Sequence, residues 1–212
     1  MSTIPFPPMQ RPLVAILRGI RPEETADIVG GLIDSGLTAI EIPLNSPEPF
    51  RSIDIAVKRA SDGILVGAGT VLTVADVARL HDAGGRLMVS PNVDPEVIAA
   101  ASARGMVTMP GVFTPTEALL AAKAGASGLK FFPAGVLGAA GITAIRAVLP
   151  AGLMIAAVGG VSDANFAEYT KAGITAFGLG SSLYKPGMAA VDVAARAKMT
   201  IAAYDRAVQR GG

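Results

Sequence analysis

The sequence predicts an α/β protein that folds as a single (β/α)₈ TIM barrel, and three observations lead to this prediction. Short apolar runs without helical periodicity alternate with helix-like segments along the chain. A helix C-cap pattern, in which small or polar residues are followed by glycine, recurs at Gly36, Gly84, Gly105, Gly125 and Gly173, with spacings of 48, 21, 20 and 48 residues. Glycines also gather after the last two apolar runs, where barrels of this kind commonly bind phosphate.

The apolar runs are expected to be buried parallel strands, because they are short and are bounded by residues that break helices. There are eight of them, which in chain order are Leu13–Gly19, Leu37–Leu44, Ile64–Thr70, Arg86–Asn92, Met106–Val112, Gly128–Pro133, Leu153–Gly160 and Ala176–Ser182.

Helical patterns lie between these runs and after the last one. They cover Glu23–Asp34, Val74–Asp82, Pro95–Ala103, Thr116–Lys123, Ala139–Val148, Asp163–Lys171 and a longer closing segment, Ala189–Gln209. A further helix is expected to end at Asp62 and Gly63, which divides the first 48-residue gap into two units of about 24 residues.

An open, doubly wound sheet would explain the same alternation of strands and helices. The barrel is favoured because the units are nearly equal in length and no Gly-x-Gly-x-x-Gly pattern opens the first strand-to-helix turn. Nothing resembling a linker divides the chain. We therefore expect one barrel domain over residues 1–212, preceded by a short Pro-rich segment at residues 1–12.

Composition excludes several classes of function. Apolar residues make up 51% of the chain and charged residues only 17%, so much of the surface is expected to be covered by further structure or by other subunits. The net charge is +1 and no basic stripe is present, which argues against nucleic-acid binding. The chain has no cysteine and a single histidine, His81, which leaves no basis for a disulfide or a His-rich metal site.

Membrane insertion is also not expected. The mean hydropathy is +0.50, but prolines and glycines interrupt every apolar stretch before it reaches the roughly 18 residues that a spanning helix needs. Residues 1–12 contain four prolines and lack the pattern of a secretory signal. The sequence thus predicts a cytoplasmic protein.

Two ionisable residues are expected inside the barrel. Side chains alternate across a strand, so Lys130 should face the lumen while Leu129 and Phe131 face the helices, and Glu41 should face the same lumen. Burial lowers the pKa of a lysine toward the neutral amine, which a Schiff-base nucleophile requires. Two structural alternatives remain at this point: a buried ion pair between Lys130 and Glu41, or a Lys130 side chain that reaches solvent.

Two glycine-rich turns predict a site for a phosphorylated ligand. They are Val158–Asp163 and Gly178–Ser182, and each leads from a strand toward a helical segment. Glycine allows the backbone to approach an anion closely, and N–H groups at such turns can donate to it.

Several motifs together resemble one family, the aldolases of 2-keto-3-deoxy-6-phosphate sugar acids. The similar phrases are AILRG at 15–19, EIPLNSP at 41–47, GAGTV at 67–71, PGV at 110–112, LKFFP at 129–133 and VGGV at 158–161, and they occur in order over nearly the whole chain. The resemblance implies a cofactor-free, metal-independent class I aldolase that yields pyruvate and glyceraldehyde 3-phosphate. It also implies a homotrimer.

The resemblance places the family's Schiff-base lysine at Lys130 and its proton-shuttling glutamate at Glu41. It implies substrate contacts at Arg18 and Thr70, and contacts around the substrate phosphate at Gly159, Gly160, Gly180 and Ser181. Members that act on the gluconate acid usually carry Arg and Thr where this chain has Asn45 and Val158, which favours the galactonate epimer as substrate.

Three other functions stay open on the sequence alone. The same chemistry could act on the gluconate epimer. A phosphosugar isomerase or epimerase of this fold would use Glu41 as a base and Lys130 only as an electrostatic partner. A non-catalytic protein that binds a phosphorylated metabolite would bind its ligand without turnover.

Overall fold

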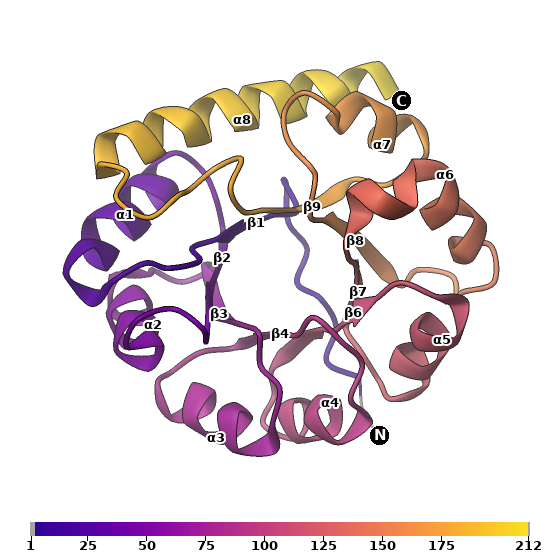
Figure 1. Cartoon of the computed structure of the whole chain (residues 1–212), viewed down its shortest axis with the longest axis horizontal. Helices are drawn as coiled ribbons and strands as arrows, with labels where there is room; N and C mark the ends of the chain where they lie inside the picture. The colour runs from indigo at the N-terminus through magenta and orange to yellow at the C-terminus, as the bar shows by residue number, and fades with distance from the viewer. Residues whose placement is uncertain (1–2, 212) are drawn as a thin grey trace.

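The computed structural model describes residues 3–211, which form a barrel of parallel strands surrounded by helices (Figure 1). The strands are β1 (Leu13–Ile16), β2 (Ala39–Pro43), β3 (Leu65–Gly69), β4 (Leu87–Val89), β5 (Val107–Met109), β6 (Gly111–Val112), β7 (Gly128–Phe131), β8 (Met154–Val158) and β9 (Ala176–Leu179). Their order around the barrel is β5-β4-β3-β2-β1-β9-β8-β7-β6, and every paired neighbour is parallel.

The strands β5 and β6 are two parts of the single fifth strand that the sequence predicts. Pro110 lies between them and, because proline has no backbone N–H, it interrupts the ladder of hydrogen bonds. Hydrogen bonds from the segment around β7 to β5 and Pro110 close the ring between the two ends of this strand order. The N–H of Ser127 donates to Thr108 O (3.1 Å), and that of Lys130 donates to Pro110 O (3.0 Å). The ring therefore has eight strand positions, and the predicted (β/α)₈ barrel is confirmed.

The helices within the described residues form the outer layer (Figure 1). They are α1 (Pro22–Asp34), α2 (Pro49–Arg59), α3 (Val74–Asp82), α4 (Pro95–Ser102), α5 (Pro115–Lys123), α6 (Ala134–Arg146), α7 (Phe166–Lys171) and α8 (Ala190–Gly211). Three of them begin at side-chain N-caps, since Thr73, Asp94 and Thr114 each accept hydrogen bonds from the first-turn N–H groups.

Three helix boundaries differ from the sequence prediction by three residues or more. Helix α2 ends at Arg59, three residues before the predicted end at Asp62. The element α6 begins at Ala134, five residues earlier than expected, and Gly138 kinks it with a φ of 71°. The regular part after this kink is the segment that the periodicity predicts. Helix α7 begins at Phe166 and not at Asp163, because the Asn165 side chain accepts a hydrogen bond from the Ser162 N–H (2.9 Å) and holds the preceding residues in a turn.

The apolar side chains form two separate clusters, one between the strands and the helices and one inside the barrel. The lumen cluster contains Val14, Val89, Met109 and other inward-facing residues. Ile4, Phe6 and Met9 pack against it. The Pro-rich N-terminal segment, in indigo, accordingly runs across the barrel in Figure 1. In the part of the chain that the structure describes, no helix combines the length and the apolar character that crossing a membrane requires.

The outer cluster predicts a large stability cost for the loss of one aromatic ring. Phe177 on β9 is fully buried, and its ring centroid lies 4.7 Å from that of Phe166 and 6.1 Å from that of Tyr204. Phe177→Ala should therefore lower the free energy of unfolding by about 3–5 kcal/mol in denaturant titrations. The control is Val136→Ala, because Val136 is 75% exposed and its loss should cost no more than about 0.5 kcal/mol. Equal losses for the two variants would contradict this assignment of the core.

Candidate active site

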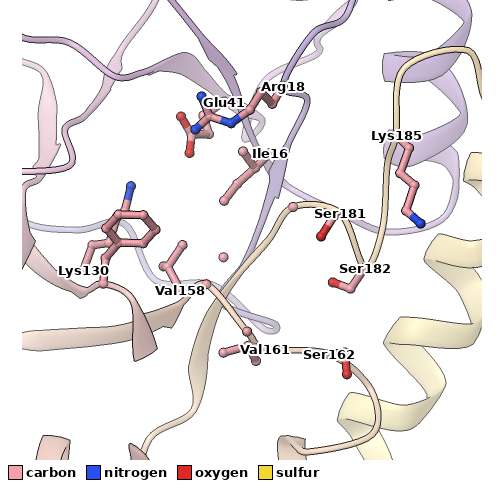
Figure 2. A pocket seen from close by; sticks show the side chains of 15 residues that line it. Ile16, Arg18, Glu41, Lys130, Val158, Val161, Ser162, Ser181, Ser182 and Lys185 are labelled. Carbon is pink, nitrogen blue, oxygen red and sulfur yellow. The ribbon is translucent and has the colours of Figure 1, made fainter. Parts of the chain in front are cut away.

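A cavity of about 440 Å³ opens at the carboxyl ends of the strands. Figure 2 shows that Lys130 and Glu41 point into the same space from different walls, while Ser162, Ser181 and Ser182 gather on another side. Of the eight residues predicted to contact substrate, seven line this cavity: Arg18, Glu41, Lys130, Gly159, Gly160, Gly180 and Ser181.

Lys130 lies on β7 and is buried at the wall of this cavity. Its side chain faces the lumen as predicted, and only 6% of the residue is exposed. Burial lowers the pKa of this amine, the nearby Glu41 carboxylate raises it in part, and the Arg18 guanidinium lowers it further. The Nζ atom lies 4.9 Å from the centroid of the Phe132 ring. The amine is thus pushed toward its neutral, nucleophilic form.

Glu41 lies on β2 and is 2% exposed. Its Oε2 atom is buried and has no hydrogen-bond partner among the described residues. Burial raises the pKa of this carboxyl group, and the positive charges of Lys130 and Arg18 offset part of the rise. An unpartnered buried oxygen is costly in a folded protein, so its presence at the base of a cavity indicates a functional group.

Both structural alternatives left open by the sequence are wrong. No ion pair within 4.0 Å joins Lys130 to Glu41 in residues 3–211, and Lys130 is buried, with only 6% of the residue exposed. The two groups influence each other electrostatically, and both line the same cavity.

Gly69, at the end of β3, makes room for the Glu41 carboxylate. A Cβ atom at this position would overlap Glu41 Oε2 and would crowd its Cδ. The backbone of Gly69 does not have a positive φ, so the constraint is steric and not conformational. Sequence patterns identify the GAGTV phrase but give no sign that this glycine supports a carboxylate on the neighbouring strand.

Arg18 and Asn45 meet near the mouth of the cavity. Both side chains are exposed, and Arg18 Nη1 donates a hydrogen bond to Asn45 Oδ1 at 2.5 Å. Asn45 does not itself line the cavity, so its contribution is to orient the guanidinium that does.

Thr70 is the one predicted site residue that is not among those lining the cavity. It follows Gly69 and has a φ of 58°, which is unusual for a β-branched residue. Hydrogen bonds on both sides hold this conformation, from the Leu44 N–H to Gly69 O (2.8 Å) and from the Val71 N–H to Val89 O (3.1 Å). A backbone held in strain beside an active site is a common mark of function. The substrate contact of Thr70 stays a prediction.

The turns after β8 and β9 present unused backbone donors. Within residues 3–211, the N–H groups of Gly160, Val161, Ser181 and Ser182 have no hydrogen-bond acceptor. Gly159 and Gly160 have φ values of 84° and 78°, which only glycine adopts easily. Such turns can bind an anion through their backbone, because several N–H groups point to one place.

The two turns that the sequence predicts as the phosphate site also bring Val158, Val161, Ser162, Gly178 and Ser182 to the cavity wall. Sequence reasoning did not assign Ile16, Phe132 and Lys185 to the site, although they line the same cavity. The alternation rule would have found Ile16, which faces the lumen from β1. In the described part of the chain, no three His, Cys, Asp or Glu residues are grouped so that they could hold a metal ion.

Comparisons with known proteins agree on one family. A family model described as "KDPG and KHG aldolase" matches residues 9–199. A probable 2-dehydro-3-deoxy-6-phosphogalactonate aldolase from Rhizobium meliloti is 72% identical over 205 residues, which cover 97% of each chain. The 2-dehydro-3-deoxy-6-phosphogalactonate aldolase of Escherichia coli is 46% identical over 93% of this chain and 97% of its own. A solved structure titled "Native KDPGal structure" is 45% identical, with a TM-score of 0.93 over 95% of this chain and 98% of that one.

The position of Gly69 generates a test of the site geometry. Gly69→Ala should displace the Glu41 carboxylate and lower turnover by roughly 10²-fold, while the fold is kept because a flexible side chain can move away from the new methyl group. The control is the same substitution in a Glu41→Ala background, where no carboxylate remains to be displaced. Gly69→Ala should cause no further loss there. An equal loss in both backgrounds would show that Gly69 acts independently of Glu41.

Proposed function

The chain belongs to the KDPG and KHG aldolase family, and on this premise we propose that it cleaves 2-dehydro-3-deoxy-6-phosphogalactonate into pyruvate and glyceraldehyde 3-phosphate. The protein is an aldolase, and hence a lyase. The observation that carries the proposal is the pair of buried ionisable groups, Lys130 and Glu41, on two walls of one cavity. This family membership favours carbon–carbon cleavage over the isomerase and the non-catalytic binding protein.

Lys130 supplies the nucleophile. Its neutral amine attacks the C2 ketone of the substrate, and loss of water from the resulting carbinolamine gives an iminium ion. The cationic iminium withdraws electrons while the C3–C4 bond breaks, and the electron pair of that bond becomes the enamine of pyruvate. Burial supports this role, because it lowers the pKa of Lys130 and so favours the neutral amine that attacks the ketone.

Glu41 moves the protons. It donates a proton to the departing hydroxyl of the carbinolamine, accepts the proton of the C4 hydroxyl during cleavage, and returns a proton to C3 of the enamine, directly or through a water molecule. Its raised pKa suits a group that must act in both directions. Hydrolysis of the last imine releases pyruvate and restores Lys130.

The two glycine-rich turns would hold the 6-phosphate at the other side of the cavity. The free N–H groups of Gly160 and Ser181 and the Ser181 hydroxyl are suitable donors. Because the phosphate is remote from the bond that breaks, its binding energy can orient C3 and C4 against Lys130 and Glu41.

Asn45 and Val158 favour the galactonate epimer. Asn45 does not line the cavity, and it accepts a hydrogen bond from Arg18, whereas an arginine at this position would add a second guanidinium near the cavity mouth. Val158 presents an apolar surface to the cavity where a threonine would offer a hydroxyl group. Compared with members that carry Arg and Thr at these two positions, this chain would therefore offer different hydrogen-bond partners to the C4 hydroxyl group of the substrate.

A homotrimer in the cytoplasm completes the proposal. Its support is the low charged fraction of 17% together with exposed apolar side chains. Leu72 and Val74 lie at the start of α3, and Phe113, Leu119 and Leu120 lie at or on α5. Contact with other copies of the chain would cover such side chains. The cytoplasmic location stays a prediction from the sequence.

The direct test of the function is an assay of pyruvate release from both epimeric 6-phosphates. We expect the galactonate compound to be cleaved with the higher kcat/KM. Asn45→Arg combined with Val158→Thr should shift the preference toward the gluconate compound, by about tenfold or more if each position contributes a polar contact. Equal rates on both epimers by the parent would contradict the proposed specificity, and release from neither would contradict the proposed reaction.

Removal of the Glu41 carboxylate should separate imine formation from turnover. Glu41→Gln should lower kcat by about 10²-fold or more, because the amide neither gives up nor accepts a proton. The variant should still be modified by borohydride in the presence of pyruvate, since Lys130 is intact. Glu96→Gln, an exposed change on α4, is the control and should leave kcat unchanged. A kcat for Glu41→Gln within a few-fold of the parent would remove Glu41 from the mechanism.

Two substitutions test the phosphate site. Gly160→Leu should push the phosphate away, and Ser181→Ala should remove one hydroxyl contact worth roughly 0.5–3 kcal/mol. Both should reduce the preference for the phosphorylated substrate over its unphosphorylated analogue. Gly152→Leu is the matched control, because Gly152 has a similar φ (81°) but lies outside this cavity. An unchanged preference in Gly160→Leu, or an equal change in Gly152→Leu, would place the phosphate elsewhere.

A further inference from the structure

We propose that Arg196 on α8 is a positioning residue that holds the two phosphate-binding turns at a fixed separation. This inference rests on the proposed function, because it assigns a task to a side chain behind the phosphate site. Arg196 does not line the cavity and is therefore not a catalytic residue.

The guanidinium of Arg196 bonds to both turns at once. Its Nε donates to the backbone oxygen of Ser182 at 2.8 Å, and its Nη2 donates to Asp163 Oδ1 at 2.6 Å. Ser182 lines the cavity after β9, and Asp163 directly follows Ser162, which lines it after β8. One side chain thus connects two segments of chain that each present N–H groups to the ligand.

Each turn also has hydrogen bonds of its own, and Gly159 O in the turn after β8 accepts the Gly135 N–H of α6 at 2.8 Å. Asn165 closes the turn after β8 through the Ser162 N–H and Gly160 O, both at 2.9 Å. In the turn after β9, Gly180 O accepts the N–H groups of Leu183 and Tyr184. Beyond the ladder of β8 and β9, which pairs Val158 with Gly178, no hydrogen bond joins the two turns to each other directly in residues 3–211. Past the strand ends, Arg196 is therefore the polar side chain that links the two turns in this part of the chain.

The link has a rigid base. Arg196 lies between Val193 and Ala197, which are fully buried, and α8 packs along α1 and α7. The side chains of Arg196 and Asp163 are 30% and 26% exposed, so the ion pair is partly shielded from solvent. A partly buried, charge-assisted pair with short bonds holds its geometry better than an exposed one.

The geometry also requires arginine. A planar guanidinium can donate to two acceptors in different directions, whereas the single ammonium of lysine sits on a shorter side chain and cannot reach both partners in the same way. A phosphate bound by N–H groups from both turns needs these groups at one separation, because small displacements in a site weaken orientation strongly.

The chain offers a matched control for this pair. Arg11 and Asp205, the latter also on α8, form a similar ion pair with bonds of 2.7 and 2.9 Å and exposures of 27% and 37%. Arg11 precedes β1 and so lies at the opposite end of the barrel from the cavity. Loss of this pair should affect stability without affecting the phosphate site.

The experiment measures kcat/KM for the phosphorylated substrate and for its unphosphorylated analogue in the parent, Arg196→Gln, Arg196→Lys, Asp163→Asn and Arg11→Gln. The expected result is a fall of about tenfold in the preference for the phosphorylated compound in both Arg196 variants, and a smaller fall in Asp163→Asn. The rate of borohydride trapping with pyruvate should remain at the parent level in all of them. Arg11→Gln should lower the melting temperature about as much as Arg196→Gln does, but it should keep the parent's preference for the phosphorylated compound.

Three results would overturn the inference. The first is an unchanged preference for the phosphorylated compound in the Arg196 variants, and the second is an equal fall of this preference in Arg11→Gln. The third is a preference fully kept by Arg196→Lys, which would indicate a role for charge alone. Failure of the proposed function is a distinct outcome, because the parent itself would then show no preference for the phosphorylated compound. If Arg196→Gln does not fold, Arg196→Lys and Asp163→Asn still report on the link.

Discussion

The burial of two ionisable groups in an apolar barrel is the constraint on which the rest of the site depends. Lys130 and Glu41 are nearly inaccessible to water, and most of the lumen around them is lined by side chains such as Val14 and Val89. Desolvation disfavours the charged form of each group, so the pKa of the amine falls while that of the carboxyl group rises. The two groups can then exchange protons with a substrate without either being fixed as an ion.

This constraint explains why supporting residues are small or are placed outside the lumen. Gly69 on β3 has no side chain, and this leaves room for the Glu41 carboxylate, which a Cβ atom at position 69 would overlap. The turns proposed to bind the phosphate present unused backbone N–H donors after β8 and β9. Arg196 acts from behind these turns. In the proposed function, the reacting groups and the phosphate-binding turns therefore lie on separate walls of one cavity.

Periodicity made the architecture and the central pair predictable. Alternation along β2 and β7 is a local property, and it placed Glu41 and Lys130 in the lumen without knowledge of the barrel's dimensions. Relations between distant segments were not predictable. The steric role of Gly69 depends on a side chain 28 positions earlier, and the Arg196 link joins residues 14 and 33 positions apart. The positive φ of Thr70 likewise follows from hydrogen bonds on both sides, which no residue type signals.

The most direct measurement of the central claim is the pH dependence of pyruvate trapping by borohydride, with peptide mapping of the modified residue. Trapping should give one adduct, on Lys130, and it should form at a lower pH than an ordinary lysine requires, because burial lowers the pKa of this amine. As the pH falls below that lowered pKa, the amine gains its proton and trapping should slow. An adduct on a different lysine, or trapping that begins only at about pH 10, where an ordinary lysine loses its proton, would contradict the account.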